Sequence, residues 1–256
     1  MTRVFSIDGN IGSGKSTFVN KLKAYYANPK NCCGKKIGFL QEPIDIWNTI
    51  RDTTGKTMIE CYYADPKQYA FAFQMMAYIS RLATLKEELK NNYDIIFSER
   101  CLLTDRNVFA KMLYDDGKIN EIEYQIYNKW FDEFIADFPI IEYIYLRTEP
   151  ETALARITKR ARPGETIPIE YLTKCHEYHD AWLNKYDNKC IIDCNANTDE
   201  DGGENIIAEW INQVDNIIIN DTSKKQYTYE MKFDGASRGN PGLCGAGFVI
   251  TKDEDV

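Results

Sequence analysis

Side chains and glycines that together could hold phosphate groups occur near the amino-terminal end of the sequence. Residues 9–16 read Gly-Asn-Ile-Gly-Ser-Gly-Lys-Ser and fit the pattern G-x-x-x-x-G-K-[ST]. In this pattern the glycines let backbone N–H groups converge on phosphate oxygens, Lys15 reaches the β- and γ-phosphates, and the Ser16 hydroxyl can ligate Mg²⁺. The predicted phosphate-binding residues are Gly9, Asn10, Ile11, Gly12, Ser13, Gly14, Lys15, Ser16 and Thr17. The motif predicts a site for a nucleoside triphosphate but leaves the reaction open.

The elements around this loop have the character that such a site requires. Apolar Val4, Phe5 and Ile7 predict a short buried strand before the loop, and a helical pattern follows it until Pro29. Further buried strands are predicted at 37–40, 94–98, 140–146 and 189–194, with helices at about 66–91, 104–115, 119–137, 168–186 and 203–219. This alternation predicts an α/β fold, a five-stranded parallel sheet of the P-loop type with helices on both faces.

Distinctive charged residues follow the predicted strands. Glu42 comes directly after the second strand, and Glu99 with Arg100 comes after the third. Because ligands of open α/β sheets bind at the carboxyl ends of the strands, we expect these side chains to lie beside the phosphate loop.

Four motifs together resemble the deoxynucleoside kinase family over roughly residues 3–219. They are the phosphate loop, Gln-Glu-Pro at 41–43 with Trp47, Tyr63-x-x-Pro leading to Phe-Gln at 73–74, and Glu-Arg-x-x-x-Thr-Asp-Arg at 99–106. The resemblance implies transfer of the γ-phosphoryl group of ATP to the 5′-hydroxyl of a deoxynucleoside in nucleotide salvage. It implies catalytic roles for Lys15, Glu42 and Arg100. Glu42 would be the base that accepts the hydroxyl proton, and Arg100 would orient Glu42 and the 5′-oxygen. Ser16 and Glu99 are the implied Mg²⁺ ligands.

The resemblance also assigns a nucleoside pocket. Gln74 would bond the base edge, Phe109 would stack on the base, and Tyr63 with Glu170 would hold the 3′-hydroxyl. The implied nucleoside-binding residues are Trp47, Tyr63, Phe73, Gln74, Ala77, Arg81, Asp105, Phe109 and Glu170. An Arg–Asp pair at 81 and 105 resembles the kinases for deoxycytidine and purine deoxynucleosides, because the carboxylate can accept from an exocyclic amino group that thymine lacks.

An arginine-rich segment resembles the lid of the same family. Arg156, Arg160 and Arg162 precede Pro-Gly at 163–164, and the first two share a helix face. Guanidinium groups that close on the phosphates would stabilise charge in the transition state. A solvated basic helix end is the alternative interpretation.

The residues after about 220, here called the tail, differ in sequence character from those before them. A polar linker over 220–226 separates a kinase domain, residues 1–219, from residues 227–256. In this tail a strand at 227–233, a glycine-rich turn at 234–242 and a returning strand at 245–251 resemble the opening hairpin of ribonuclease H domains. There Asp234 would bind catalytic metal. Because two-metal chemistry needs several carboxylates, we expect no nuclease activity from these residues alone and interpret them as part of a truncated fusion or of a longer product.

The composition of the chain indicates which partners and which cell compartment are expected. A net charge of −8 argues against non-specific nucleic-acid binding, and no stretch approaches a membrane span. The absence of a signal-like start, together with eight cysteines, predicts free thiols and a cytoplasmic protein. His176 and His179 lack zinc-type partners and are interpreted as part of a solvated helix face. The family resemblance implies a homodimer through helices near 66–91 and 104–137.

Two other functions remain open at this point. A nucleoside monophosphate kinase of the thymidylate kinase type shares the loop, the lid and an Asp-Arg pair, although Glu42 with Trp47 favours a nucleoside acceptor. A non-catalytic nucleotide-binding module tethered to the tail is the other alternative. The presence of Lys15, Glu99 and Arg100 argues against it.

Overall fold

The computed structural model describes the backbone of residues 2–136, 138–161, 167–187, 189–198, 202–221, 229–237 and 244–252, and side chains as far as residue 218. The chain divides into two compact units, residues 1–211 and 212–256. No helix within the described ranges has both the length and the apolar character needed to cross a membrane.

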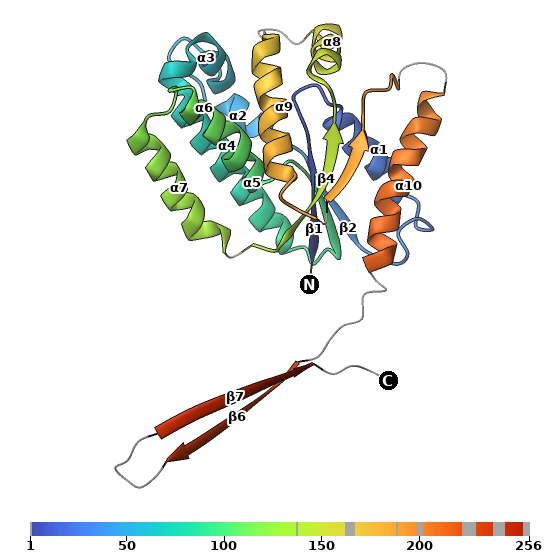
Figure 1. The fold of residues 1–256 in the computed structure, drawn as a ribbon. Coiled ribbons are helices and arrows are strands. Elements are labelled where there is room, and N and C mark those ends of the chain that lie inside the picture. Colours follow the sequence, from blue (N-terminus) through green and yellow to red (C-terminus); the bar gives the residue numbers. More distant parts are fainter. Residues whose placement is uncertain are drawn as a thin grey trace. The chain divides into compact units, whose positions relative to one another are not determined.

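A five-stranded sheet forms the centre of the first unit (Figure 1). Its strands are β1 (Arg3–Asp8), β2 (Ile37–Leu40), β3 (Ile95–Glu99), β4 (Ile141–Arg147) and β5 (Lys189–Asp193). They are all parallel and lie in the order β2-β3-β1-β4-β5. The predicted α/β fold with a five-stranded parallel sheet is therefore confirmed.

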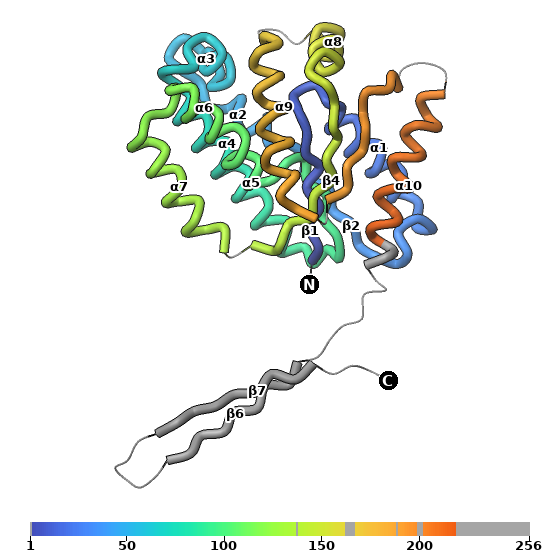
Figure 2. Tube along the Cα trace, viewed as in Figure 1, coloured from blue at the N-terminus to red at the C-terminus, as the bar shows by residue number. Residues whose placement is uncertain are grey.

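Helices cover both faces of this sheet, as the backbone trace in Figure 2 shows. One face carries α1 (Lys15–Tyr26) and the first half of α10 (Gly203–Asp221), and the other carries α4 (Pro66–Leu89) and α9 (Ile169–Leu183). The helix α7 (Glu121–Ile135) packs on the outer side of α4, and α8 (Pro150–Arg160) lies beyond the carboxyl ends of the strands. The short helices are α2 (Ile44–Thr49), α3 (Met58–Ala64), α5 (Leu102–Thr104), the π-helix η1 (Asp105–Ala110) and α6 (Lys111–Asp115).

The alternation of side chains along each strand builds a core on each side of the sheet. On the α1 side, the rings of Phe5, Phe39 and Tyr26 stack around Phe97, with ring centroids 5.5–5.7 Å apart. On the α9 side, Val4, Ile96 and Tyr143 pack in one cluster with Trp182. Since both faces are buried, apolar residues occur at consecutive positions in the central strands, and the polar residues Ser6, Asp8 and Ser98 in these strands are buried as well.

The π-helix η1 lies where the third strand leads back to the pocket. The structure places Asp105 and Phe109 on this segment, within the region predicted as one ordinary helix over 104–115. Single π-turns are rare and occur often at functional sites. Here the π-turn carries two of the residues assigned to the nucleoside pocket.

The second unit contains an antiparallel hairpin of β6 (Tyr229–Ser237) and β7 (Cys244–Lys252). The predicted turn over 234–242 is wrong in part, because residues 234–237 continue strand β6. Gly235 pairs with Ala246 and Ala236 with Gly245. Small residues on both strands let the ladder extend through a segment whose glycines suggested a turn.

Candidate active site

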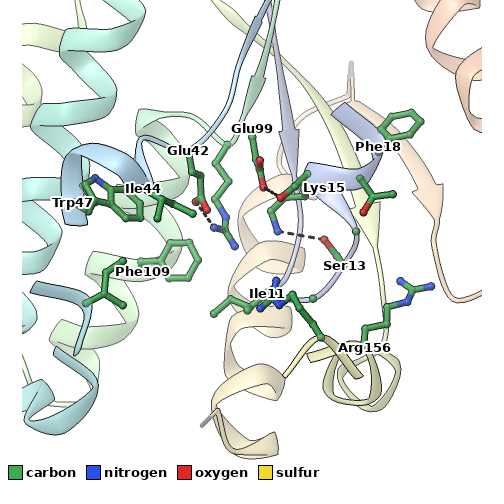
Figure 3. Close-up of a pocket in the computed structure, with 18 of the residues that line it drawn as sticks. Ile11, Ser13, Lys15, Phe18, Glu42, Ile44, Trp47, Glu99, Phe109 and Arg156 are labelled. Atoms are coloured by element: carbon green, nitrogen blue, oxygen red, sulfur yellow. Dashed lines mark hydrogen bonds and ion pairs between the residues drawn. The ribbon is translucent and has the colours of Figure 1, made fainter. Parts of the chain in front are cut away.

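A large cavity opens at the carboxyl ends of the parallel strands. Its volume is about 1470 Å³, which exceeds the roughly 300–1,000 Å³ of ordinary small-ligand sites. Glu42, Trp47 and Phe109 lie toward one end, and Ser13, Lys15 and Arg156 lie toward the other (Figure 3). The cavity therefore has room for two ligands, one beside the aromatic residues and one beside the phosphate loop.

The phosphate loop has a conformation that needs glycine. Gly12 has a φ of +80°, and a Cβ there would lie 2.6 Å from the carbonyl oxygen of Ala153 in α8. Asn10 is buried and anchors the loop, since its Nδ2 donates to the Leu172 carbonyl at 2.8 Å and its Oδ1 accepts from the Ile11 N–H. Gly9 and Asn10 are not among the described residues that line the cavity, and the Asn10 side chain bonds backbone groups of Ile11 and Leu172.

This geometry yields a matched pair of predictions. We expect Gly12→Ala to lower stability by about 1–3 kcal/mol more than Gly14→Ala, because the new methyl group overpacks against α8. Both glycines have positive φ values, +80° and +92°, but a Cβ at Gly14 would meet nothing within 4 Å. Thermal unfolding of the two variants measures the difference, and the phosphate donor KM should rise more in Gly12→Ala. Equal effects would show that backbone strain alone matters.

Lys15 and Ser16 begin α1, and their polar ends reach the loop and the end of β3 respectively. Lys15 Nζ donates to the Asn10 carbonyl at 2.6 Å. Burial, reinforced by the positive charge of Arg100, lowers the pKa of Lys15 to about 7. The Ser16 hydroxyl donates to Glu99 Oε1 at 2.7 Å. A hydroxyl and a carboxylate side by side on the cavity wall are oxygen donors of the kind that hold Mg²⁺ together with substrate phosphates.

Glu42 lies between two guanidinium groups. Arg100 Nη1 donates to Glu42 Oε1 at 2.5 Å, and Arg81 Nη2 donates to the same oxygen at 3.3 Å. Burial alone would raise the pKa of Glu42, but Arg100, Arg81 and Lys15 outweigh it and lower that pKa to about 2. Glu42 is therefore an ionised carboxylate at neutral pH, held in place and able to accept a proton.

A strained backbone holds Arg100 in position. Its φ is +62°, which is unusual for a residue with a side chain. The Arg100 N–H donates to the Ile7 carbonyl at 3.0 Å, and the Ser98 hydroxyl donates to the Arg100 carbonyl at 2.7 Å. Backbone strain of this sort persists only where the surroundings enforce it, and it is concentrated at functional sites.

The aromatic end of the cavity has the features of a pocket for a planar ring. Trp47 is fixed by a 2.8 Å hydrogen bond from Nε1 to the Ser80 hydroxyl, and Phe73 meets it edge-on with ring centroids 5.7 Å apart. Gln74 lines the cavity and is 3% exposed, and its Oε1 has no hydrogen-bond partner within the described part of the chain. A buried amide oxygen that faces a cavity is suited to accept from a ligand.

Asp105 pairs with Arg81 beside this amide. Arg81 Nε donates to Asp105 Oδ2 at 3.0 Å, and both side chains are buried. Burial raises the pKa of Asp105 even though Arg81 opposes the effect. Ala77 and Phe109 also line the cavity here, and the Arg100 guanidinium lies 4.8 Å from the centre of the Phe109 ring. The structure thus brings these predicted nucleoside-binding residues together.

The predicted sugar and lid residues are only partly assembled. Tyr63 lines the cavity, whereas Glu170 is exposed and is not among the described residues that line it. Arg156 and Arg160 line the phosphate end, where Arg156 Nη2 donates to the Ala196 carbonyl at 2.9 Å. Arg162 lies outside the described residues. The roles of Glu170 and the lid arginines stay predictions.

Several lining residues escaped the sequence analysis. Tyr62 and Tyr171 line the aromatic end of the cavity, and Asn195, Asn197 and Trp210 line the phosphate end. The two asparagines follow the fifth strand, so the rule that ligands bind at the carboxyl ends of strands could have identified them. The tyrosines and Trp210 lie in amphipathic helices, where their types do not distinguish pocket lining from core.

The interpretation of His176 and His179 as a solvated face is wrong. His179 is fully buried, its ring stacks on Tyr145 with centroids 6.0 Å apart, and burial lowers its pKa to about 3. His176 is 9% exposed and contacts Arg147 at 2.9 Å. Both histidines occupy the inner face of α9 with Leu172 and the other buried residues of that helix, so the H-x-x-H spacing follows the packing. The cysteines in the described side chains are all free.

Comparison with known proteins agrees with this geometry. The family model described as deoxynucleoside kinase matches residues 5–219. The chain is 36% identical over 200 residues to deoxycytidine kinase of Homo sapiens, which covers 70% of this chain and 74% of that protein. It is 32% identical over 200 residues to the mitochondrial deoxyguanosine kinase of Xenopus laevis, which covers 70% of this chain and 72% of the relative.

Proposed function

Because the chain belongs to the deoxynucleoside kinase family, we propose that it moves the γ-phosphoryl group of ATP to the 5′-hydroxyl of an amino-bearing deoxynucleoside. The chain is a kinase that phosphorylates deoxynucleosides in nucleotide salvage; the donor, the preferred base and the residue roles are the proposal. The observation that carries it is the position of Glu42, an ionised carboxylate on the cavity wall at the end with Trp47 and Phe109.

In this mechanism the protein positions two reactants and neutralises charge. Glu42 accepts the proton of the 5′-hydroxyl as the new O–P bond forms. Arg100 fixes the Glu42 carboxylate from one side and places its positive charge near the attacking oxygen. The phosphate loop with Lys15 holds the donor, and Arg156 and Arg160 of α8 face the same end of the cavity.

We propose Ser16 and Glu99 as the residues that hold Mg²⁺. Their oxygens are 2.7 Å apart and belong to the chemical class that Mg²⁺ prefers. A bound Mg²⁺ would neutralise charge on the donor phosphates.

Asp105 supports a preference for bases that carry an exocyclic amino group. Its carboxylate can accept from the amino group of cytosine or adenine, whereas a thymine carbonyl would face a buried negative charge. Steady-state assays with ATP and Mg²⁺ should give deoxycytidine or a purine deoxynucleoside a kcat/KM at least about tenfold above that of thymidine. Comparable values for all four nucleosides would contradict the preference.

The same assays test the rival reaction. A nucleoside monophosphate kinase would use deoxynucleoside 5′-monophosphates and ignore the nucleosides. A non-catalytic module would bind ATP without turnover of either class. Running both sets of acceptors in parallel separates these outcomes.

An apolar stripe on α7 supports the proposed homodimer. Ile122, Ile126, Trp130 and Phe134 recur every four residues and are 41–70% exposed. A stripe of this kind marks an interaction surface. By light scattering, Trp130→Glu should shift the mass toward the monomer, and Ile191→Glu, an equally exposed apolar position on β5, should not. A wild-type monomer would refute the proposal.

We also propose that the hairpin β6–β7 begins a ribonuclease H-like fold with Asp234 as a metal ligand. The antiparallel register of the two strands supports it. The 256-residue chain should leave an RNA–DNA hybrid intact in Mg²⁺, since one carboxylate does not suffice. Cleavage that is lost in Asp234→Asn would overturn this expectation.

The cytoplasmic location stays a prediction, which imaging of the tagged chain would check.

A further inference from the structure

The guanidinium of Arg81 makes three directed contacts at once. Its Nε donates to Asp105 Oδ2 at 3.0 Å, its Nη1 to the Glu99 carbonyl at 2.7 Å, and its Nη2 to Glu42 Oε1 at 3.3 Å. Arg81 is 5% exposed, and its pKa lies above the usual value because the two carboxylates outweigh the cost of burial. Arg81 thus spans two functional groups that belong to different parts of the site.

The two ends of this contact have different proposed tasks. Asp105, on η1, faces the base of the acceptor, and Glu42, after β2, accepts the proton of the 5′-hydroxyl. They lie on separate elements, and Arg81 of α4 contacts both. Because the donors of a guanidinium are held in one rigid plane, a displacement at Nε is transmitted to Nη2.

We propose that Arg81 is a positioning residue that couples recognition of the base at Asp105 to the orientation and charge of Glu42. This inference rests on the proposed function and extends it. A base that donates an amino hydrogen to Asp105 leaves the Arg81 contacts in place. A base that presents a carbonyl repels the Asp105 carboxylate, shifts the Arg81 guanidinium and weakens its hydrogen bond to Glu42. The identity of the base then changes kcat as well as KM.

The charges around Glu42 give the proposal a directional test. Arg81 from α4, Arg100 from the turn after β3 and Lys15 from α1 all lower the pKa of Glu42. Asp105 acts in the opposite sense, because the two carboxylates raise each other's pKa. Removing Arg81 must therefore raise the pKa of Glu42 from about 2, whereas removing the charge of Asp105 must leave it unchanged or lower it.

The experiment compares Arg81→Met with Asp105→Asn in the full chain, with saturating ATP, Mg²⁺ and deoxycytidine. We expect the acid limb of the kcat–pH profile to move up by about one to three pH units in Arg81→Met. Asp105→Asn should raise the deoxycytidine KM without moving that limb upward. Arg81→Lys keeps the positive charge but not the planar guanidinium. The acid limb of its kcat–pH profile should therefore lie between those of wild type and Arg81→Met. This variant supplies the same readout if Arg81→Met fails to fold.

Two outcomes overturn the proposal. If both variants raise KM alike while their pH profiles superimpose on wild type, Arg81 only recognises the base. If the limb rises equally in Asp105→Asn, the effect is a general loosening of the pocket. A wild-type chain that phosphorylates no deoxynucleoside would instead refute the proposed function, so the two failures are distinguishable.

Discussion

Glu42→Gln is expected to lower kcat for the preferred deoxynucleoside by about a hundredfold or more, the usual contribution of a positioned base. Glutamine keeps the size of the side chain and an oxygen that Arg100 can contact, but it cannot accept a proton. The nucleoside KM should change little, because Trp47, Gln74 and Asp105 are untouched. Steady-state kinetics with a coupled ADP assay measures both quantities.

The same substitution has a signature in stability. The pKa of Glu42 is about 2 in the folded protein against an ordinary value of 4.5, so the ionised carboxylate stabilises the fold above pH 4.5 and this contribution is lost as pH falls toward 2. Glu42→Gln should lack that part of the acid dependence. The exposed Glu87→Gln on α4 is the matched control. A Glu42→Gln enzyme with wild-type kcat would exclude a proton-accepting role.

Lys15→Met is expected to abolish most turnover while making the protein more stable. Loss of the cation that reaches the phosphates should lower kcat/KM for ATP by about 10²–10³. Burial holds the pKa of Lys15 at about 7 instead of 10.5, which corresponds to a penalty on the order of a few kcal/mol for the charged form. Removing that charge should raise Tm at pH 6 by about 5 °C or more.

The pH dependence of this effect has a definite sign. Between pH 7 and 10.5 the unfolded chain binds more protons at Lys15 than the folded protein does, so stability rises with pH in that window. Below pH 7 the penalty is present in full. The Tm gain of Lys15→Met should therefore shrink as pH rises above 7. Lys23→Met, an exposed change on the same helix, should show no gain. A destabilised Lys15→Met protein would contradict the burial penalty.

The sequence predicted the sheet and the phosphate loop because these features are local. A glycine at position 12 is required by a positive φ and a nearby helix, and the apolar strands are continuous because both faces are covered. Strand ends meet at one edge of a parallel sheet, so Glu42, Glu99 and Arg100 could be placed beside the loop without coordinates.

Contacts and burial that depend on tertiary packing could not be predicted from the sequence. The contact of Arg81 with Glu42 joins residues 39 positions apart, and nothing in the spacing predicts which carboxylate a guanidinium will reach. His179 lies on the buried face of α9 although its residue type suggested solvent. Glu170 stands two positions into the same helix and is exposed, a difference of helical phase that the motif does not reveal.

The atom that receives the γ-phosphoryl group distinguishes a deoxynucleoside kinase from a monophosphate kinase. Incubation with γ-labelled ATP, Mg²⁺ and deoxycytidine, deoxyadenosine or deoxyguanosine should place the label on the 5′-oxygen, as product NMR would show, and Glu42→Gln should suppress it. Label that appears only when a deoxynucleoside 5′-monophosphate is the acceptor would contradict the account and assign the chain to the monophosphate kinases.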